Sequence, residues 1–180
     1  YLHLLDKAVK RVGGIFKKNK VEIVRYADDF LLMGKKIERK VIVYLYGLLE
    51  RMKLTVNEEK SRRVNALKES FDFLGFTYRK DKDLKGRNKK YWNIFPSKKV
   101  EKKMKENISL LLKTNGHAPP KVIVQKLNEK IRGWINYFTI PKVSYPQKAK
   151  RNIRWYLIEK IYRYYKRKSQ RKCKLYNQKA

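Results

Sequence analysis

The stretch Arg25-Tyr26-Ala27-Asp28-Asp29-Phe30 places two neighbouring carboxylates between two short apolar runs, residues 21–24 and 30–33. Runs of this length, rich in Val, Ile and Leu, predict two strands. Carboxylates are costly to desolvate without a partner, so the pair belongs either in a surface turn or beside a bound cation. Asp-Asp is common in turns, and its oxygen atoms also suit Mg²⁺. The sequence therefore predicts a hairpin over residues 21–34, whose tip is either an ordinary turn or a metal site.

The charge of the chain indicates a polyanionic partner. Its 180 residues, enough for one domain or two small ones, include 48 Lys and Arg against 16 Asp and Glu, a net charge of +32. With 42% hydrophobic residues the chain can also build real cores. An excess this large points first to nucleic acid, and to an anionic membrane surface as the alternative. No run of 18 apolar residues occurs, so we expect no membrane span.

Cysteine and histidine are too scarce for a disulfide framework or a zinc cluster. The one cysteine is Cys173, and the two histidines, His3 and His117, lie far apart in the sequence. This composition fits a reducing cytoplasmic compartment. The 13 Tyr and 3 Trp are interleaved with basic residues, which suits stacking on bases, although packing is the commoner use of aromatic side chains.

Helical and extended patterns alternate in the first part of the chain. Residues 1–18 have apolar side chains at helical spacing and predict a helix that stops at Gly13-Gly14. Residues 36–53 carry one apolar stripe and predict a helix that covers a sheet. Residues 54–57 predict a short strand, followed by a polar loop.

Residues 71–95 predict a long hairpin. Residues 71–78 alternate and are rich in aromatics, which is typical of a strand. Gly75 inside this strand suggests close approach of another backbone or of a ligand. A basic tip over residues 79–90, with Gly86 as its turn residue, leads to a returning strand over 91–95.

From Pro96 onwards the pattern is helical, so we predict a domain boundary near residue 96. Ser97 is a candidate N-cap, and residues 115–116 and 119–120 carry the Asn-Gly and Pro-Pro signals that end one helix and begin the next. Three helices with short connectors predict a small bundle. The last helix has an apolar side, while its other sides carry Arg and Lys.

The order of these blocks resembles the later part of a group II intron reverse transcriptase, also called a maturase. Tyr26-Ala27-Asp28-Asp29 is similar to the catalytic hairpin of reverse transcriptases. Leu54-Thr55-Val56-Asn57-Glu58-Glu59-Lys60-Ser61 resembles the family's loop after the cover helix, and Phe73-Leu74-Gly75-Phe76 resembles its primer-grip strand. Residues 127–138, which include Gly-Trp-Ile-Asn-Tyr-Phe, resemble the maturase thumb, or domain X. The similarity covers nearly the whole chain.

The resemblance implies an α+β fold: a partial reverse-transcriptase palm over residues 1–95, a helical thumb over 96–168, and a basic tail over 169–180. It also implies RNA-directed DNA synthesis at two Mg²⁺ ions, with Asp28 and Asp29 as catalytic metal ligands. The residues implied in contacts with the incoming nucleotide or primer-template are Tyr26, Lys60, Phe73, Leu74, Gly75 and Phe76. The residues expected to contact intron RNA are Arg132, Asn136, Arg151, Arg154, Arg163, Lys166 and Arg167.

Two residues in the thumb block, Trp134 and Phe138, are expected in the bundle core. Gly133 is expected to allow close contact, because a glycine inside a helix costs about 1 kcal/mol relative to alanine.

In that family the fingers and the first metal-binding Asp lie upstream, and the chain begins after them. Asp6 is expected to be no substitute, because it falls in the first helix, away from any strand end. We therefore expect the chain alone not to polymerise DNA, and a separate N-terminal half to be a possible partner. Its other expected partners are group II intron RNA and an RNA/DNA primer-template, in a cytoplasmic ribonucleoprotein and not in a membrane.

Other functions remain open from the sequence. The same basic helices serve an RNA-binding splicing cofactor, or a structural ribonucleoprotein component, that never polymerises. A reverse transcriptase of a defence or diversity-generating system is a further alternative, against which the thumb block argues.

Overall fold

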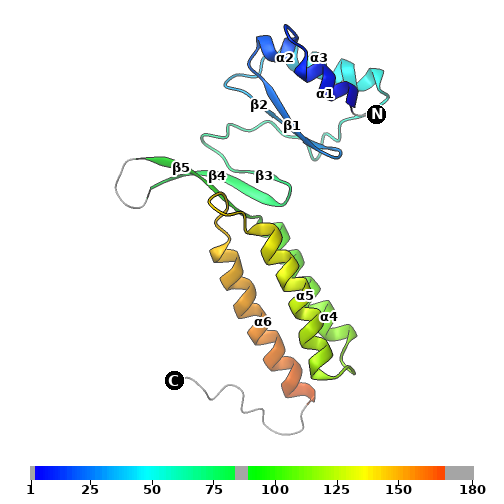
Figure 1. Ribbon diagram of the computed structural model, residues 1–180, viewed down its shortest axis with the longest axis vertical. Coiled ribbons are helices and arrows are strands. Elements are labelled where there is room, and N and C mark those ends of the chain that lie inside the picture. Colours follow the sequence, from blue (N-terminus) through cyan, green and yellow to red (C-terminus); the bar gives the residue numbers. More distant parts are fainter. Residues whose placement is uncertain (1–2, 84–88, 169–180) are drawn as a thin grey trace. The chain divides into compact units, whose positions relative to one another are not determined.

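The computed structural model describes residues 3–83 and 89–168, which form two compact units, Tyr1–Arg63 and Val64–Ala180 (Figure 1). Several predictions lie outside the described residues: the first two residues of the N-terminal helix, the turn at Gly86, and the basic tail 169–180 with Cys173.

The first unit packs three helices with one hairpin. Its elements are α1 (His3–Lys10), α2 (Ile15–Lys18), β1 (Glu22–Tyr26), β2 (Asp29–Met33) and α3 (Arg39–Arg51). The two strands pair antiparallel, as the apolar runs predict. The buried core is shared by the helices and the segments that flank them, and it consists of Leu5, Phe16, Val21, Val41, Leu45, Leu49 and Met52.

The helical run stops before Gly13-Gly14 as predicted: Gly13 has a φ of +72°, which is unsuited to a helix, and the short helix α2 follows it. One prediction for this unit needs correction. The strand expected over residues 54–57 does not form. Leu54 and Val56 pack instead against the hydrophobic core, so their alternation reflects packing of an irregular segment and not pairing in a sheet.

The second unit contains a three-stranded antiparallel sheet in the order β3-β4-β5. The strands are β3 (Phe71–Phe73), β4 (Phe76–Lys82) and β5 (Lys90–Pro96). The strand predicted over residues 71–78 is therefore divided into β3 and β4, which are separated by Leu74 and Gly75. The long hairpin is formed by β4 and β5.

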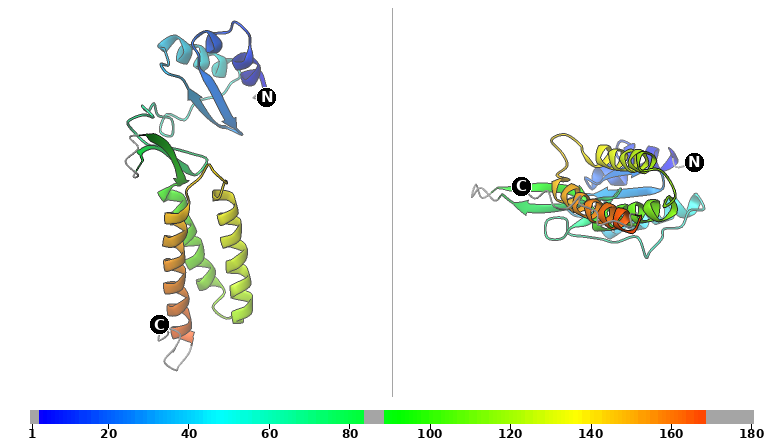
Figure 2. Two further views of the ribbon diagram at one scale, coloured as in Figure 1. Left: turned by 60° about the vertical axis from the view of Figure 1, so that its left-hand side comes forward. Right: turned by 90° about the horizontal axis from the view of Figure 1, so that it is seen from below.

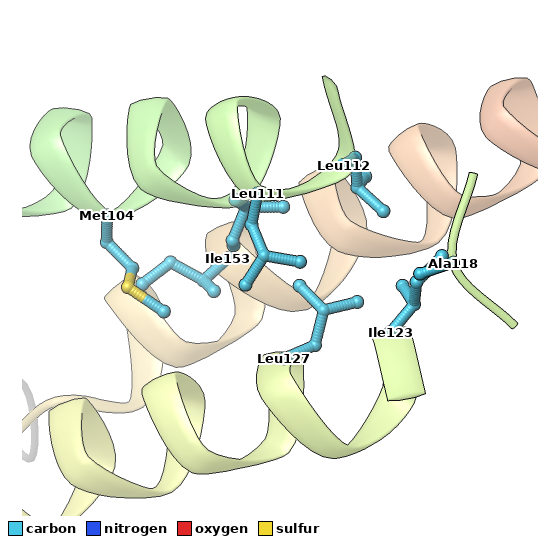
Figure 3. Packing of buried hydrophobic residues seen from close by; sticks show 8 residues of the cluster. Met104, Leu111, Leu112, Ala118, Ile123, Leu127 and Ile153 are labelled. Atoms are coloured by element: carbon cyan, nitrogen blue, oxygen red, sulfur yellow. The ribbon is translucent and has the colours of Figure 1, made fainter. Parts of the chain in front are cut away.

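The predicted three-helix bundle is confirmed. Its helices are α4 (Lys98–Thr114), α5 (Pro120–Phe138) and α6 (Gln147–Lys168), and Figure 2 shows them running alongside one another. The helices begin and end close to the residues that the sequence indicates: the Ser97 hydroxyl accepts a hydrogen bond from the amide of Val100, and Asn115 follows α4. Figure 3 shows the shared core, made of Met104, Ile108, Leu111, Leu112, Ala118, Ile123, Leu127 and Ile153.

The sheet and the bundle belong to one compact unit, Val64–Ala180, and contacts join them across residue 96, where the sequence predicts a domain boundary; that boundary stays a prediction. The amide of Ser97 donates to the carbonyl of Gly75 (2.8 Å), and the amide of Tyr145 donates to the carbonyl of Ile94 (2.7 Å). The α+β class is confirmed, while the assignment of these parts to a palm and a thumb stays a prediction. No helix in the described part of the chain could cross a membrane.

Candidate functional site

The two carboxylates of the first unit lie at the tip of the β1–β2 hairpin. Tyr26 pairs with Asp29, which leaves Ala27 and Asp28 as a two-residue loop. Ala27 has a φ of +50°, a left-handed conformation that costs a non-glycine residue about 1–2 kcal/mol. Tight two-residue hairpins require such angles. Asp28 and Asp29 are both exposed, and the side chain of Tyr26 beside them is 66% exposed.

Arg25 holds this turn in place. Its Nε and Nη2 atoms donate to the two carboxylate oxygens of Asp6 (3.1 and 2.6 Å), and its Nη1 donates to the carbonyl of Ala27 (3.0 Å). The guanidinium of Arg25 lowers the pKa of Asp6, and Asp6 in turn raises the pKa of Arg25. Arg25 therefore connects α1 to the loop that carries Asp28.

The position of Asp6 corrects one expectation from the sequence. Asp6 does belong to the first helix, but it contacts Arg25 and so lies beside the end of β1. Nothing in the local sequence indicated this, because the two residues are 19 positions apart. Both carboxylate oxygens of Asp6 accept hydrogen bonds from Arg25, so Asp6 does not offer a free metal ligand.

The hairpin tip suits a magnesium ion in part. Mg²⁺ in proteins usually takes one or two carboxylates together with water and substrate phosphates, and Asp28 and Asp29 are adjacent and exposed. Within residues 3–83 and 89–168, however, no three acidic, His or Cys side chains come together. The described residues thus supply two ligands, fewer than the three carboxylates that the resemblance implies.

Lys60 lies in a turn that follows the core of the first unit. The side chain of Asn57 accepts a hydrogen bond from the amide of Lys60 (3.1 Å), and the Lys60 side chain is exposed. No described contact joins Lys60 to the carboxylates of the hairpin, so its implied role in nucleotide binding stays a prediction.

Residues 73–76 form a hairpin turn and not a continuous strand. Phe73 pairs with Phe76, while Leu74 and Gly75 have φ angles of +51° and +80°. Positive φ at both central positions defines the type I′ turn that closes tight hairpins. The primer-grip strand expected here is therefore corrected to a turn. Phe73 and Phe76 lie on one face although they are three positions apart, which a continuous strand with a period of two does not allow, so this spacing was a signal of the turn that the prediction missed.

This turn is fixed to the ends of two helices. The hydroxyl of Tyr137 in α5 donates to the carbonyl of Leu74 (3.2 Å). A Cβ atom on Gly75 would lie 3.1 Å from Val100 Cγ2 in α4 and 3.4 Å from Phe138 Cζ in α5. Gly75 therefore allows a close approach, as its place in the sequence suggested, and the neighbours that come close are side chains.

The two most distinctive blocks of the second unit contact each other through aromatic rings. The ring of Phe76 lies 4.9 Å from that of Phe138 and 5.8 Å from that of Tyr137, and the Trp134 ring lies 4.9 Å from that of Phe138. Trp134 is partly buried against the bundle core, as predicted, whereas the buried Phe138 packs against Phe76 and the turn at Gly75. The contact between the blocks spans more than 60 residues of sequence, and the sequence alone did not reveal it.

Arg132 and Asn136 lie one turn apart on the exposed side of α5. Gly133 between them is not a packing site, because a Cβ atom there would meet nothing within 4 Å. The close contact expected at Gly133 is therefore absent from the described part of the chain, and α5 is open to the outside at this point.

The basic residues predicted on the last helix are all exposed along α6: Arg151, Arg154, Arg163, Lys166 and Arg167. Arg163 forms an ion pair with Glu159 at 2.5 Å. Trp155 on the same helix is 63% exposed, and no sequence pattern had singled it out. On its inner side α6 is joined to α4 by a hydrogen bond of 2.6 Å between the hydroxyls of Tyr156 and Ser109.

Comparison with known protein families identifies the helical part of the chain. Residues 101–176 match the family described as group II intron, maturase-specific domain. Over these residues the chain is similar to a maturase-specific domain. The match runs from the first turns of α4 to beyond the end of α6, so it coincides with the bundle and with the exposed basic residues on α5 and α6. It confirms the family that the sequence motifs indicate. None of the curated proteins compared with the chain matches it.

Proposed function

We propose that the chain acts as part of a group II intron maturase, and that it binds intron RNA on the exposed polar sides of α5 and α6. The observation that carries this proposal is the family match over residues 101–176, which falls on the helices that expose Arg132, Asn136 and the basic residues of α6. The net charge of +32 supports a polyanionic partner.

The two helices offer different chemistry to RNA. Arg132 and Asn136 combine a forked cation with an amide that both donates and accepts, which suits phosphate and 2′-hydroxyl groups in the shallow groove of an RNA helix. Arg151 and Arg154 offer cations to the backbone phosphates. Arg163 already donates to Glu159, so we expect it to contribute less to RNA binding than these two arginines.

A pair of charge-matched variants tests the proposal. The double variant R151A/R154A on α6 is compared with K103A/K113A on α4, which removes two exposed positive charges from the same unit. We expect the α6 variant to weaken binding to a group II intron RNA, and to lower the slope of log affinity against log salt by about 0.9 for each phosphate that the protein no longer neutralises. Equal weakening by both variants would mean that net charge alone attracts the RNA, and would contradict the proposal.

We also propose that the β1–β2 hairpin belongs to an RNA-directed DNA polymerase site, with Asp28 and Asp29 holding Mg²⁺. When bound, the metal would activate a primer hydroxyl and stabilise the leaving pyrophosphate. Arg25 holds the loop that carries Asp28, and Tyr26 lies exposed beside it, where a primer end could contact its ring. If the protein extends a primer on an RNA template, Asp28→Ala should abolish the extension and leave RNA binding intact.

An RNA-binding splicing cofactor without polymerase activity is the second candidate. It is favoured by the two-ligand hairpin, in which Asp6 is engaged by Arg25 within the described residues. This function predicts intron RNA binding and support of splicing by both the wild type and Asp28→Ala, with no cDNA from either protein. Loss of splicing in Asp28→Ala would give the carboxylates a structural role instead.

A further inference from the structure

The sheet of the second unit has two chemically different faces. Side chains alternate along a strand, so the register β3-β4-β5 assigns each residue to one face. One face, which we call the lysine face, begins at the aromatic contact with α5 and continues away from it. Beyond Phe73, Phe76 and Pro96 it carries Phe71, Tyr78, Lys80, Lys82, Lys90, Trp92 and Ile94.

On the opposite face, the acidic side chains accept hydrogen bonds from their neighbours. Asp81 accepts hydrogen bonds from Arg79 (2.7 and 2.8 Å) and from Asn93 (2.7 Å), and Asp72 accepts one from Thr77 (2.6 Å). Arg79 also lowers the pKa of Asp81. All the acidic side chains of the three strands lie on this opposite face, and the strand residues of the lysine face include no carboxylate.

An aromatic row crosses the lysine face. The rings of Phe71 and Tyr78 stack at 5.0 Å with an interplanar angle of 5°, and the Trp92 ring meets Phe71 edge-on at 6.5 Å. Phe71 and Tyr78 are partly buried, while Trp92 at the end of the row is 40% exposed. The row thus ends in an exposed indole that is held from one side by its neighbours.

Two lysines of this face are placed where they do not help folding. Lys82 and Lys90 are directly opposite each other on β4 and β5, and like charges in such a pair destabilise a sheet. The ammonium of Lys80 lies 5.7 Å from the centre of the Trp92 ring. A nucleotide stacked on Trp92 would therefore bring its phosphate within reach of several cations.

We propose that the lysine face binds single-stranded nucleic acid, with a base stacked on Trp92 and the backbone held by Lys80, Lys82 and Lys90. Stacking on an exposed aromatic ring requires an unpaired base, which excludes the interior of a duplex. This site goes beyond the proposed function, because it lies on the sheet, whereas the RNA surface proposed above lies on α5 and α6. The family match begins at residue 101, after the last strand.

Two probes of equal charge test the stacking step. One is an unstructured RNA of about 12 nucleotides, within the range of single-stranded binding sites, and the other is an abasic backbone of the same length. We expect Trp92→Ala to weaken binding of the base-bearing RNA roughly five- to hundredfold and to leave binding of the abasic backbone unchanged. Tyr91→Ala is the matched control, because Tyr91 is 38% exposed and lies on the opposite face.

A second variant keeps the test independent of any damage to the aromatic row. K82A/K90A removes a repulsive cross-strand pair, so we expect it to fold at least as well as the wild type. It should lower the salt slope for the single strand by about 0.7 for each lysine that contacts a phosphate. R151A/R154A should bind the single strand at the lysine face as tightly as the wild type does. The two double variants together therefore distinguish a failure of the lysine-face proposal from a failure of the proposed RNA surface on α6.

Three results would overturn the proposal. In the first, Trp92→Ala weakens the binding of both probes equally, which would make the ring a structural residue. In the second, Tyr91→Ala has the same effect as Trp92→Ala. In the third, K82A/K90A abolishes binding to phosphatidylserine vesicles and leaves RNA binding unchanged, which would assign the lysine face to a membrane surface.

Discussion

Substitution of Gly75 by alanine tests how the hairpin turn is joined to the helices. Gly75 has a φ of +80°, and holding an alanine in this left-handed region costs about 1–2 kcal/mol. The added methyl group would lie 3.1 Å from Val100 Cγ2, with Phe138 Cζ at 3.4 Å, and excess atoms in a packed region cost about 1–3 kcal/mol. We therefore expect Gly75→Ala to lower the free energy of unfolding by about 2–5 kcal/mol.

Gly133 provides the matched control, because the same substitution there should have the opposite sign. It lies within α5, and an added Cβ would meet nothing within 4 Å. Replacing a helical glycine by alanine then stabilises by about 1 kcal/mol. Urea unfolding followed by tryptophan fluorescence reports on this unit, since all three tryptophans lie in it. A Gly75→Ala variant within about 0.5 kcal/mol of the wild type would refute the packing described for the turn.

Substitutions at three further positions test other parts of the structure. Ser97→Ala should cost about 0.5–2 kcal/mol, because it removes the hydroxyl that caps α4 at Val100, and urea unfolding measures the loss. The hydrogen bonds from Arg25 lower the pKa of Asp6 from its ordinary value of 3.8, so on acidification Asp6 takes up its proton in the unfolded state before it does so in the folded state. The stabilisation that Asp6 contributes is therefore complete above the unfolded pKa and is lost as the pH falls through the folded pKa. The hydrogen-exchange protection factors of the β1–β2 hairpin should fall with the pH over this range in the wild type and not in Asp6→Asn. Trp134→Phe should cost less than about 1 kcal/mol, against about 3–5 for Trp134→Ala, because the buried indole Nε1 has no hydrogen-bond partner in the described part of the chain, whereas the ring packs on Phe138. Thermal or urea unfolding of the two variants checks this order.

The sequence predicted those features that depend on local patterns. The apolar runs around Asp28 and Asp29 indicated the hairpin, and Ser97 indicated the start of α4, because pairing of short strands and capping are decided within a few residues. The exposed positions of Arg132 and Asn136 on α5 also agree with the helical spacing of the apolar residues beside them.

The features that the sequence did not predict depend on contacts between distant residues. The prediction of one strand over residues 71–78 overlooked a change of phase, because Phe73 and Phe76 are three positions apart and a period of two therefore breaks at Leu74 and Gly75. The sequence could not show the packing of this turn against Val100 and Phe138, which only the folded chain brings close. The bond between Arg25 and Asp6 was missed for the same reason.

These contacts bear on how the proposed surfaces could work together. The turn at residues 73–76 is hydrogen-bonded to Tyr137 and Ser97, so it belongs to the same compact unit as the maturase-specific helices. A nucleic acid held at this turn, on the lysine face or along α6 would therefore be held by one body. The Asp28–Asp29 hairpin belongs to the other unit. If the chain supports polymerisation, the metal ligands lie on one unit and the surfaces proposed to hold the nucleic acid lie on the other. K82A/K90A should then raise the primer concentration that gives half-maximal extension and leave the extension rate at saturating primer unchanged.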